Sequence, residues 1–160
     1  MNLIGAAANL YDAFAALVQH WPELSTFATR FAGLPVRNSG TLGGNVANGS
    51  PIGDSMPLLI ALGTRIVLAS ARGERSLALE DFYTGYRQTV LAADEVVARL
   101  LVPSPEPGEF LRAYKISKRY DDDISAVCLA ISLHRDGPTV NRVRIGAGGV
   151  AATPARAHQA

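Results

Sequence analysis

The stretch from Arg37 to Asp54 (RNSGTLGGNVANGSPIGD) is rich in glycine and asparagine and has few bulky side chains. Glycine weakens helices and strands, so a cluster of it suggests a backbone that turns sharply and approaches something closely. Peptide N–H groups in such a bend can form a concave anion site, and Thr41, Asn45, Asn48 and Ser50 add uncharged hydrogen-bonding groups. The residues predict a loop around a polar, phosphate-bearing ligand. A solvent loop between two elements explains them about equally well.

The composition indicates a globular protein of one ordinary domain or two small ones, with 160 residues, 48% hydrophobic and 18% charged. A net charge of +1, with both signs interspersed, argues against a nucleic-acid surface. No apolar run approaches the roughly 20 residues of a membrane helix, and no signal peptide is evident, so we expect no membrane partner and a cytoplasmic location. The single cysteine, Cys128, excludes an internal disulfide and an iron–sulfur cluster held by four cysteines of this chain.

The first segment predicts a strand followed by two helices. Residues 3–8 are short and apolar, as in a strand, and Asn9 is placed to cap a helix that ends near His20, before Pro22. A second helix is expected over residues 23–31. From the residues alone, Phe31 at its end is best interpreted as a core phenylalanine.

Alternating and helical patterns continue after the glycine-rich stretch. Asp54 or Ser55 is placed to cap the next helix, which Gly63 ends. The expected elements are a helix over 56–62, a hairpin of strands 64–69 and 76–79, a helical turn at 80–82, an irregular segment over 83–91 and a strand over 96–102.

Residues 103–108 (PSPEPG) mark the clearest break in composition, because three prolines and a glycine cannot extend a helix or sheet. We place a domain boundary there, between units 1–104 and 109–160. The second unit predicts an antiparallel meander and the first turn of a helix at Thr153-Pro154; its strands cover 110–117, 124–134 and 140–147. Three strands without a covering helix leave one face open, so a fragment of a larger polypeptide is expected.

Four ordered blocks carry a family resemblance over nearly the whole chain. RNSGTLGGNVANGSPIGDSMP resembles the flavin-binding loop of the xanthine dehydrogenase family of molybdenum hydroxylases. EDFYTGYRQTVLAADEVV, YKISKRYDDDISAV and GAGGVAATPARA follow in the family's order and spacing. The wording ANGSPIGDSMP is most similar to the FAD-bearing small subunit of bacterial members. It fits the carbon monoxide dehydrogenase and hydroxybenzoyl-CoA reductase branches less well.

The resemblance implies an α+β fold. Its first part would be the second subdomain of the FAD-binding fold shared with vanillyl-alcohol oxidase (the PCMH-type domain). The three-stranded antiparallel sheet of a CO-dehydrogenase-flavoprotein-like C-terminal domain would follow. The family's first FAD subdomain, its cysteine-rich domains and the end of its C-terminal domain have no counterpart here. The chain would then hold about half of the FAD contacts and, alone, bind FAD weakly or not at all.

The resemblance also assigns site residues. Positions matching the family's FAD contacts are Thr41, Leu42, Gly43, Gly44, Asn45 and Asp54, and Val97 and Lys115 match two further positions. Phe31 stands where the family has an aromatic side chain beside the isoalloxazine ring, which reverses the interpretation above. Lys115 could place positive charge near the flavin. An equally good interpretation from the residues is a solvent lysine paired with the run Asp121 to Asp123.

The implied function is the last stage of an electron-transfer chain. A molybdopterin-bearing large subunit would oxidise the substrate, 2Fe-2S clusters would carry electrons to FAD, and reduced FAD would pass a hydride to NAD. No residue here needs to act as a general acid or base, so no catalytic residue is assigned. Two alternatives are a non-catalytic assembly module that lacks the cofactor and the flavoprotein subunit of an aldehyde- or N-heterocycle-oxidising relative.

Other candidate sites are weaker. His20, His134 and His158 are scattered without ligand spacing, so no metal site is assigned. The Asp121 to Asp123 run, just after Lys118-Arg119, is typical of a solvated turn. Cys128 lies inside a predicted strand and is expected to be inert packing.

Overall fold

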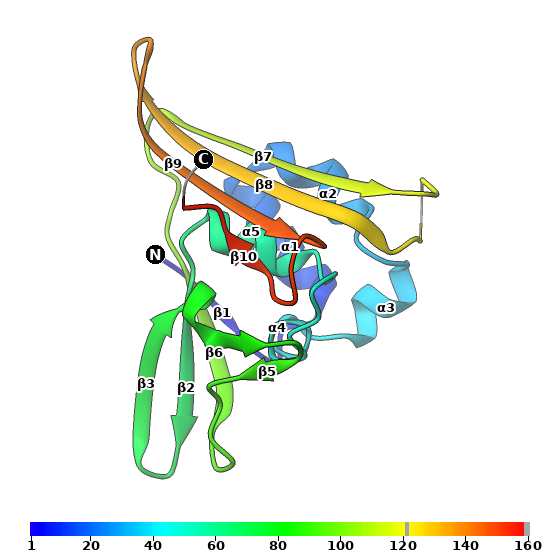
Figure 1. Cartoon of the computed structure of the whole chain (residues 1–160), viewed down its shortest axis with the longest axis vertical. Coiled ribbons are helices and arrows are strands. Elements are labelled where there is room, and N and C mark those ends of the chain that lie inside the picture. Colours follow the sequence, from blue (N-terminus) through cyan, green and yellow to red (C-terminus); the bar gives the residue numbers. More distant parts are fainter. Residues whose placement is uncertain (121, 159–160) are drawn as a thin grey trace.

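The computed structural model describes residues 1–120 and 122–158 and contains two four-stranded antiparallel sheets with helices between and beside them (Figure 1). The first sheet has the order β1 (Asn2–Gly5), β6 (Val96–Val102), β2 (Arg65–Ser70) and β3 (Gly73–Ala78). The second has the order β10 (Ala155–Arg156), β9 (Thr139–Gly148), β8 (Ser125–Asp136) and β7 (Glu109–Ser117).

Short helices connect and cover these sheets. In chain order they are α1 (Leu10–His20), the 3₁₀ turn η1 (Pro22–Leu24), α2 (Ser25–Thr29), α3 (Leu34–Ser39), α4 (Leu42–Ala47), α5 (Ser55–Ala61) and η2 (Leu79–Phe82). A small hairpin of β4 (Tyr83–Gly85) and β5 (Gln88–Thr89) follows η2. Among the described residues, no helix is both long and apolar enough to cross a membrane.

Helix α5 occupies the centre of the molecule, and all seven of its residues are buried. It packs against β8 and β9 of the second sheet and against η2. The buried core is one contiguous cluster that runs from Ile4 and Phe14 through Leu59 to Leu111 and Ala130. The segment 103–108, where we place the domain boundary, lies between β6 and β7, and apolar contacts join the elements on its two sides.

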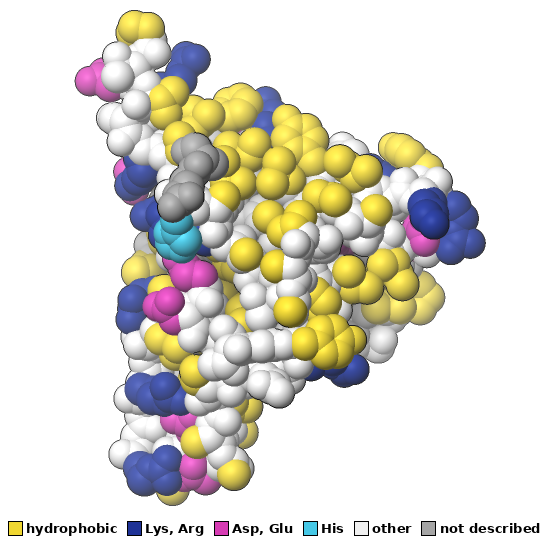
Figure 2. Space-filling view, in the orientation of Figure 1, with side chains coloured by type: hydrophobic (Ala, Val, Ile, Leu, Met, Phe, Trp, Pro, Cys, Tyr) yellow, Lys and Arg dark blue, Asp and Glu magenta, His cyan; other side chains and the backbone are white. Residues whose placement is uncertain are grey.

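The second sheet has one buried and one open face. Leu111, Cys128 and Ala130 point inward and are buried. Phe110, Tyr114 and Ile116 alternate with the inward positions along β7 and are exposed. Figure 2 shows hydrophobic side chains gathered over β7 to β9. The predicted open face of the meander is therefore present in the structure.

Several predicted elements are confirmed. Helix α1 begins after Asn9, whose Oδ1 accepts a hydrogen bond from the Asp12 N–H at 2.7 Å. The helix before Gly63, the hairpin β2–β3, the strand β6 and the three strands of the meander all form within a few residues of their predicted bounds.

Other predictions were wrong, because long-range contacts decide the local conformation. The first strand stops at Gly5: the Ala6 and Ala8 carbonyls leave the ladder and accept from the Gly43 and Leu42 N–H groups of α4. The expected helix over 23–31 breaks into η1 and α2. The glycine-rich loop contains α4 and half of α3, and residues 83–91 contain the β4–β5 hairpin. Residues 155–156 pair with β9 where a helix was expected.

Removing the Asn9 cap tests the local origin of α1. Asn9→Ala is expected to lower the free energy of unfolding by about 1 kcal/mol, because the Asp12 N–H loses its acceptor. Asn9→Ser, which keeps a capping oxygen, should lose less than half of that. Urea unfolding followed by the fluorescence of Trp21, which lies just after α1, measures both values. Equal losses for the two variants would contradict the capping role.

Candidate functional site

A cleft of about 530 Å³ lies between α3, α4 and the segment that joins β7 to β8. Four of the positions that the family resemblance assigns to FAD contacts meet there: Phe31, Asn45, Asp54 and Lys115. Phe31 and Lys115, the two that are farthest apart in the sequence, are separated by 84 positions. The other lining residues are Leu10, Ala32, Gly33, Val36, Asn48, Ser50, Ile52, Gly53, Asp122, Asp123, Ile124 and Ser125.

A buried ion pair forms part of the cleft wall. Lys115 Nζ lies 2.6 Å from Asp54 Oδ2 and donates also to Ser125 Oγ at 2.9 Å. Both charged residues are less than one tenth exposed. Asp54 stands at the N-cap position of α5, yet its side chain makes no capping bond, because it faces Lys115 instead. Asp54 Oδ1 is buried and has no hydrogen-bond partner among the described residues.

Two carboxamides line the cleft, that of Asn45 on α4 and that of Asn48 at its C-cap. The Oδ1 of Asn48 accepts from Arg87 at 2.7 Å, and the Oδ1 of Asn45 accepts from the buried Ser55 hydroxyl at 2.5 Å. A guanidinium only donates, so the contact with Arg87 fixes which way the Asn48 amide faces. With both oxygens engaged, the two NH₂ groups are the parts of these side chains left to bind a ligand. They are three residues apart and share one helix face.

An apolar wall faces these polar groups. Phe31 is 6% exposed, and its ring centroid is 4.8 Å from that of Phe14. Val36, Ile52 and Ile124 also line the cleft and are exposed. A surface of this kind favours a flat, largely apolar ligand that carries a few oxygen and nitrogen atoms.

The peptide N–H groups around Gly43 and Gly44 are not free, which corrects the anion-site interpretation. The Leu42 and Gly43 N–H groups donate to the Ala8 and Ala6 carbonyls at 2.9 and 3.0 Å, and the Gly44 N–H donates to the Thr41 hydroxyl at 3.0 Å. The Asn45 N–H donates to the Thr41 carbonyl. A Cβ on Gly43 would lie 2.7 Å from Ala6 Cα, so this glycine permits close packing between α4 and the turn after β1.

The other positions that the resemblance assigns to FAD contacts are absent from the lining of the cleft. Thr41 caps α4, and Leu42, the first residue of that helix, is buried. Gly44 is exposed beside the Thr41 hydroxyl. Val97 lies in β6, opposite Leu68, and packs on the core. The flavin contacts assigned to these positions stay predictions.

Acidic and thiol groups near the cleft have distinct roles. Asp122 and Asp123 line it, and Asp123 pairs with Arg119, while Asp121 lies outside the described residues. Burial raises the pKa of the Cys128 thiol, and the negative charge of Asp54 raises that pKa further, so the thiol stays neutral and packs as an apolar group. Over residues 1–120 and 122–158, no group of three or more His, Cys, Asp or Glu side chains could hold a metal ion.

Ser55 and Arg87 belong to the site through their contacts with Asn45 and Asn48, although neither was assigned a site role from the sequence, and Asn48 was singled out only as a hydrogen-bonding group of the predicted loop. The available signal was the spacing of Asn45 and Asn48, which puts both side chains on one face if the segment is helical. That signal was missed because the stretch was interpreted as a loop.

Comparison with known proteins shows which family this chain belongs to. The profile of the family described as the FAD binding domain in molybdopterin dehydrogenase matches residues 2–105. This chain belongs to that family. A second profile, the CO dehydrogenase flavoprotein C-terminal domain, matches residues 112–160. The family resemblance, the α+β fold class and FAD as the cofactor are thereby confirmed.

Individual relatives support this family assignment. Xanthine dehydrogenase/oxidase of Gallus gallus is 34% identical over 163 residues, which span 93% of this chain and 12% of the relative. Carbon monoxide dehydrogenase from Hydrogenophaga pseudoflava superposes with a TM-score of 0.90 at 32% identity, covering 98% of this chain and 55% of that one. Quinoline 2-oxidoreductase from Pseudomonas putida 86 superposes with a TM-score of 0.85 at 28% identity and the same coverage. The chain therefore spans about half of these structural relatives.

Proposed function

We propose that this chain is the FAD-binding part of a xanthine dehydrogenase and that it passes electrons from molybdenum and 2Fe-2S centres through FAD to NAD. The observation that carries its flavin-binding role is Asp54 Oδ1, a buried acceptor beside the cleft without a donor among the described residues. Leaving a buried polar atom unpaired costs about 1–3 kcal/mol, so such an atom at a cleft indicates a bound donor.

The other lining groups fit FAD as well. An isoalloxazine ring is flat and carries N–H and carbonyl groups, which suit the Phe31 wall, the Asp54 oxygen and the Asn45 amide. Asn48 adds a second neutral donor, and amide NH₂ groups suit phosphate or carbonyl oxygens. Hydrogen bonds to Asp54 and Ser125 fix the position of the Lys115 ammonium group beside the cleft. When bound, FAD supplies the redox chemistry, and the protein supplies binding, orientation and electrostatics.

The wider assignments belong to the same proposal. A molybdopterin-bearing large subunit and a 2Fe-2S domain would be the electron donors, NAD the acceptor and the cytoplasm the location. Similarity to quinoline 2-oxidoreductase favours an N-heterocycle-oxidising relative as the second candidate. Assaying the whole protein with xanthine and with quinoline, and with NAD and oxygen as acceptors, separates these possibilities. Turnover of quinoline and not of xanthine would replace the first candidate by the second.

A titration with FAD tests the binding role of the cleft. The 16.9 kDa chain suits amide NMR, and residues of the cleft should show the largest shifts. We expect weak binding, with a dissociation constant on the order of 0.1 mM, because the chain spans only 55% of its structural relatives. Unshifted spectra at millimolar FAD, together with no flavin absorbance in the whole gene product, would favour the assembly module that lacks the cofactor.

A negative charge introduced at the C-cap of α4 makes that titration more specific. Asn48→Asp keeps the size of the side chain but replaces an N–H donor by a carboxylate, so it should weaken FAD binding about tenfold or more. Asn38→Asp adds the same charge on α3, away from the cleft lining, and should leave affinity within about twofold. Equal effects of the two variants would show that Asn48 does not contact the ligand.

A further inference from the structure

The turn that carries Phe31 into the cleft wall has an unusual backbone. Ala32 has a φ of +51°, in the left-handed region that side chains rarely adopt. That conformation costs roughly 1 kcal/mol or more for a residue with a Cβ. Phe31 immediately precedes it, between the Phe14 ring and the cleft. Some other contact must therefore stabilise the turn.

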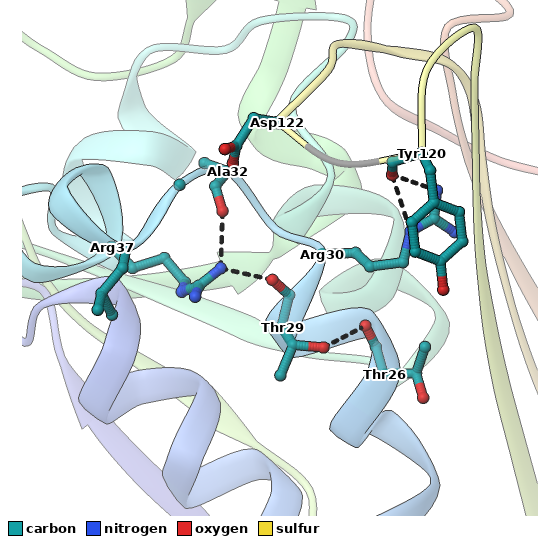
Figure 3. A pocket seen from close by; sticks show the side chains of 9 residues that line it. Thr26, Thr29, Arg30, Ala32, Arg37, Tyr120 and Asp122 are labelled. Carbon is teal, nitrogen blue, oxygen red and sulfur yellow. Dashed lines mark hydrogen bonds between the residues drawn. The ribbon is translucent and has the colours of Figure 1, made fainter.

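Arg37 supplies that contact. Its Nη1 atom donates to the carbonyls of Thr29, Phe31 and Ala32 at 2.6, 3.0 and 2.6 Å. Figure 3 shows the guanidinium reaching from α3 toward the main chain at Thr29 and Ala32. One nitrogen thus gathers three main-chain acceptors of a single turn.

A pocket lies beside this turn. It has a volume of about 400 Å³, and Arg30 and Arg37 line it together with Thr26, Thr29 and Tyr120. Arg30 donates to the carbonyls of Lys115 and Tyr120, so both guanidiniums bind main-chain oxygens. Because both arginines donate to main-chain carbonyls, we interpret their role as structural and not as the binding of an anion.

We infer that Arg37 is a positioning residue for the flavin cleft: it clamps residues 29–32 so that the Phe31 ring stays in the cleft wall. The inference rests on the proposed FAD-binding function. Arg37 is absent from the lining of the cleft itself, so it acts through Phe31. The Phe31 ring in turn presents a flat apolar surface to the ligand.

A double-mutant cycle with Phe31 tests this route. Arg37→Met should weaken FAD binding about tenfold in the otherwise unchanged chain and less than twofold in a Phe31→Leu background. Arg65→Met is the matched control, because Arg65 also donates to a main-chain carbonyl, that of Ser76 on the β2–β3 hairpin. It should leave affinity unchanged. An Arg37→Met effect of equal size in both backgrounds would overturn the inference.

Amide hydrogen exchange tests the clamp without any flavin. In Arg37→Met the N–H groups of Arg30 and Phe31, which are bonded to Thr26 and Ala28, should exchange at least tenfold faster, while those of the β7–β9 sheet stay protected. Unchanged exchange at these two amides would overturn the clamp even if FAD binds. If the unaltered chain and the whole protein bind no FAD while exchange responds as expected, the clamp stands and the proposed function fails.

A rescue variant separates the clamp from a general loss of structure. Ala32→Gly removes the strain at φ +51°, because glycine adopts that conformation readily. The double variant Arg37→Met with Ala32→Gly should bind FAD at least threefold more tightly than Arg37→Met alone. A further loss in the double variant would contradict a role through this turn.

Discussion

Gly146→Ala is expected to lower the free energy of unfolding by about 3 kcal/mol. A Cβ at this position of β9 would lie 2.8 Å from the carbonyl carbon of Pro57 and closer still to its oxygen. Those atoms are α5 backbone, so they cannot turn aside as a side chain does. The substitution must push the second sheet away from α5, whose seven residues are all buried. Urea unfolding of the two proteins measures the difference.

Gly5→Ala is the matched control, because a Cβ on Gly5 would meet nothing within 4 Å. It should change stability by less than about 0.5 kcal/mol. Gly148→Ala provides a milder test if Gly146→Ala does not fold, since its Cβ would lie 2.8 Å from Pro57 Cγ, a side-chain atom. A Gly146→Ala protein as stable as the Gly5→Ala protein would show that β9 does not pack on α5 as described.

Close approaches between elements that are far apart in the sequence explain why part of the fold could be predicted and part could not. Helix α1 and the hairpin β2–β3 follow from signals within their own residues, such as the Asn9 cap and the turn at Gly73. Helix α4 contains Gly43 and Gly44, which disfavour a helix by local propensity. It forms because Thr41 caps it and because Gly43 lets it sit against Ala6, and neither its length nor its partner is visible locally.

The site shows a similar division. The motif around Asn45 and Asp54 is recognisable by its family resemblance, and both residues line the cleft. The partners of the cleft residues are distant in the sequence: Lys115 is 61 residues from Asp54, and Arg87 is 39 residues from Asn48. These pairs exist only once the second sheet packs on α5 and the β4–β5 hairpin lies against α4. The resemblance therefore named four of the cleft's lining residues, Phe31, Asn45, Asp54 and Lys115, but the sequence did not reveal the ion pair or the amide contacts that position them.

Lys115→Met is expected to lower the free energy of unfolding by about 3–5 kcal/mol, because it leaves the Asp54 carboxylate buried without its cation. Lys115 Nζ and Asp54 Oδ2 are 2.6 Å apart, and their side chains are 5% and 7% exposed. Arg119→Met is the control: it removes a cation from the pair with Asp123, in which Arg119 is 79% exposed, and should cost less than about 1 kcal/mol. Similar losses for the two variants would contradict the burial of the Asp54–Lys115 pair.

Adding Asp54→Asn to Lys115→Met should recover more than half of the lost stability, because no uncompensated charge then remains in the core. The double variant also separates folding from binding. It removes the negative charge at Asp54 and the positive charge at Lys115, both of which line the cleft, and keeps one amide oxygen as an acceptor at position 54. If these groups bind FAD, the double variant should unfold almost like the original chain yet bind FAD at least tenfold more weakly. Recovery of stability together with unchanged FAD affinity would show that the pair serves the fold alone.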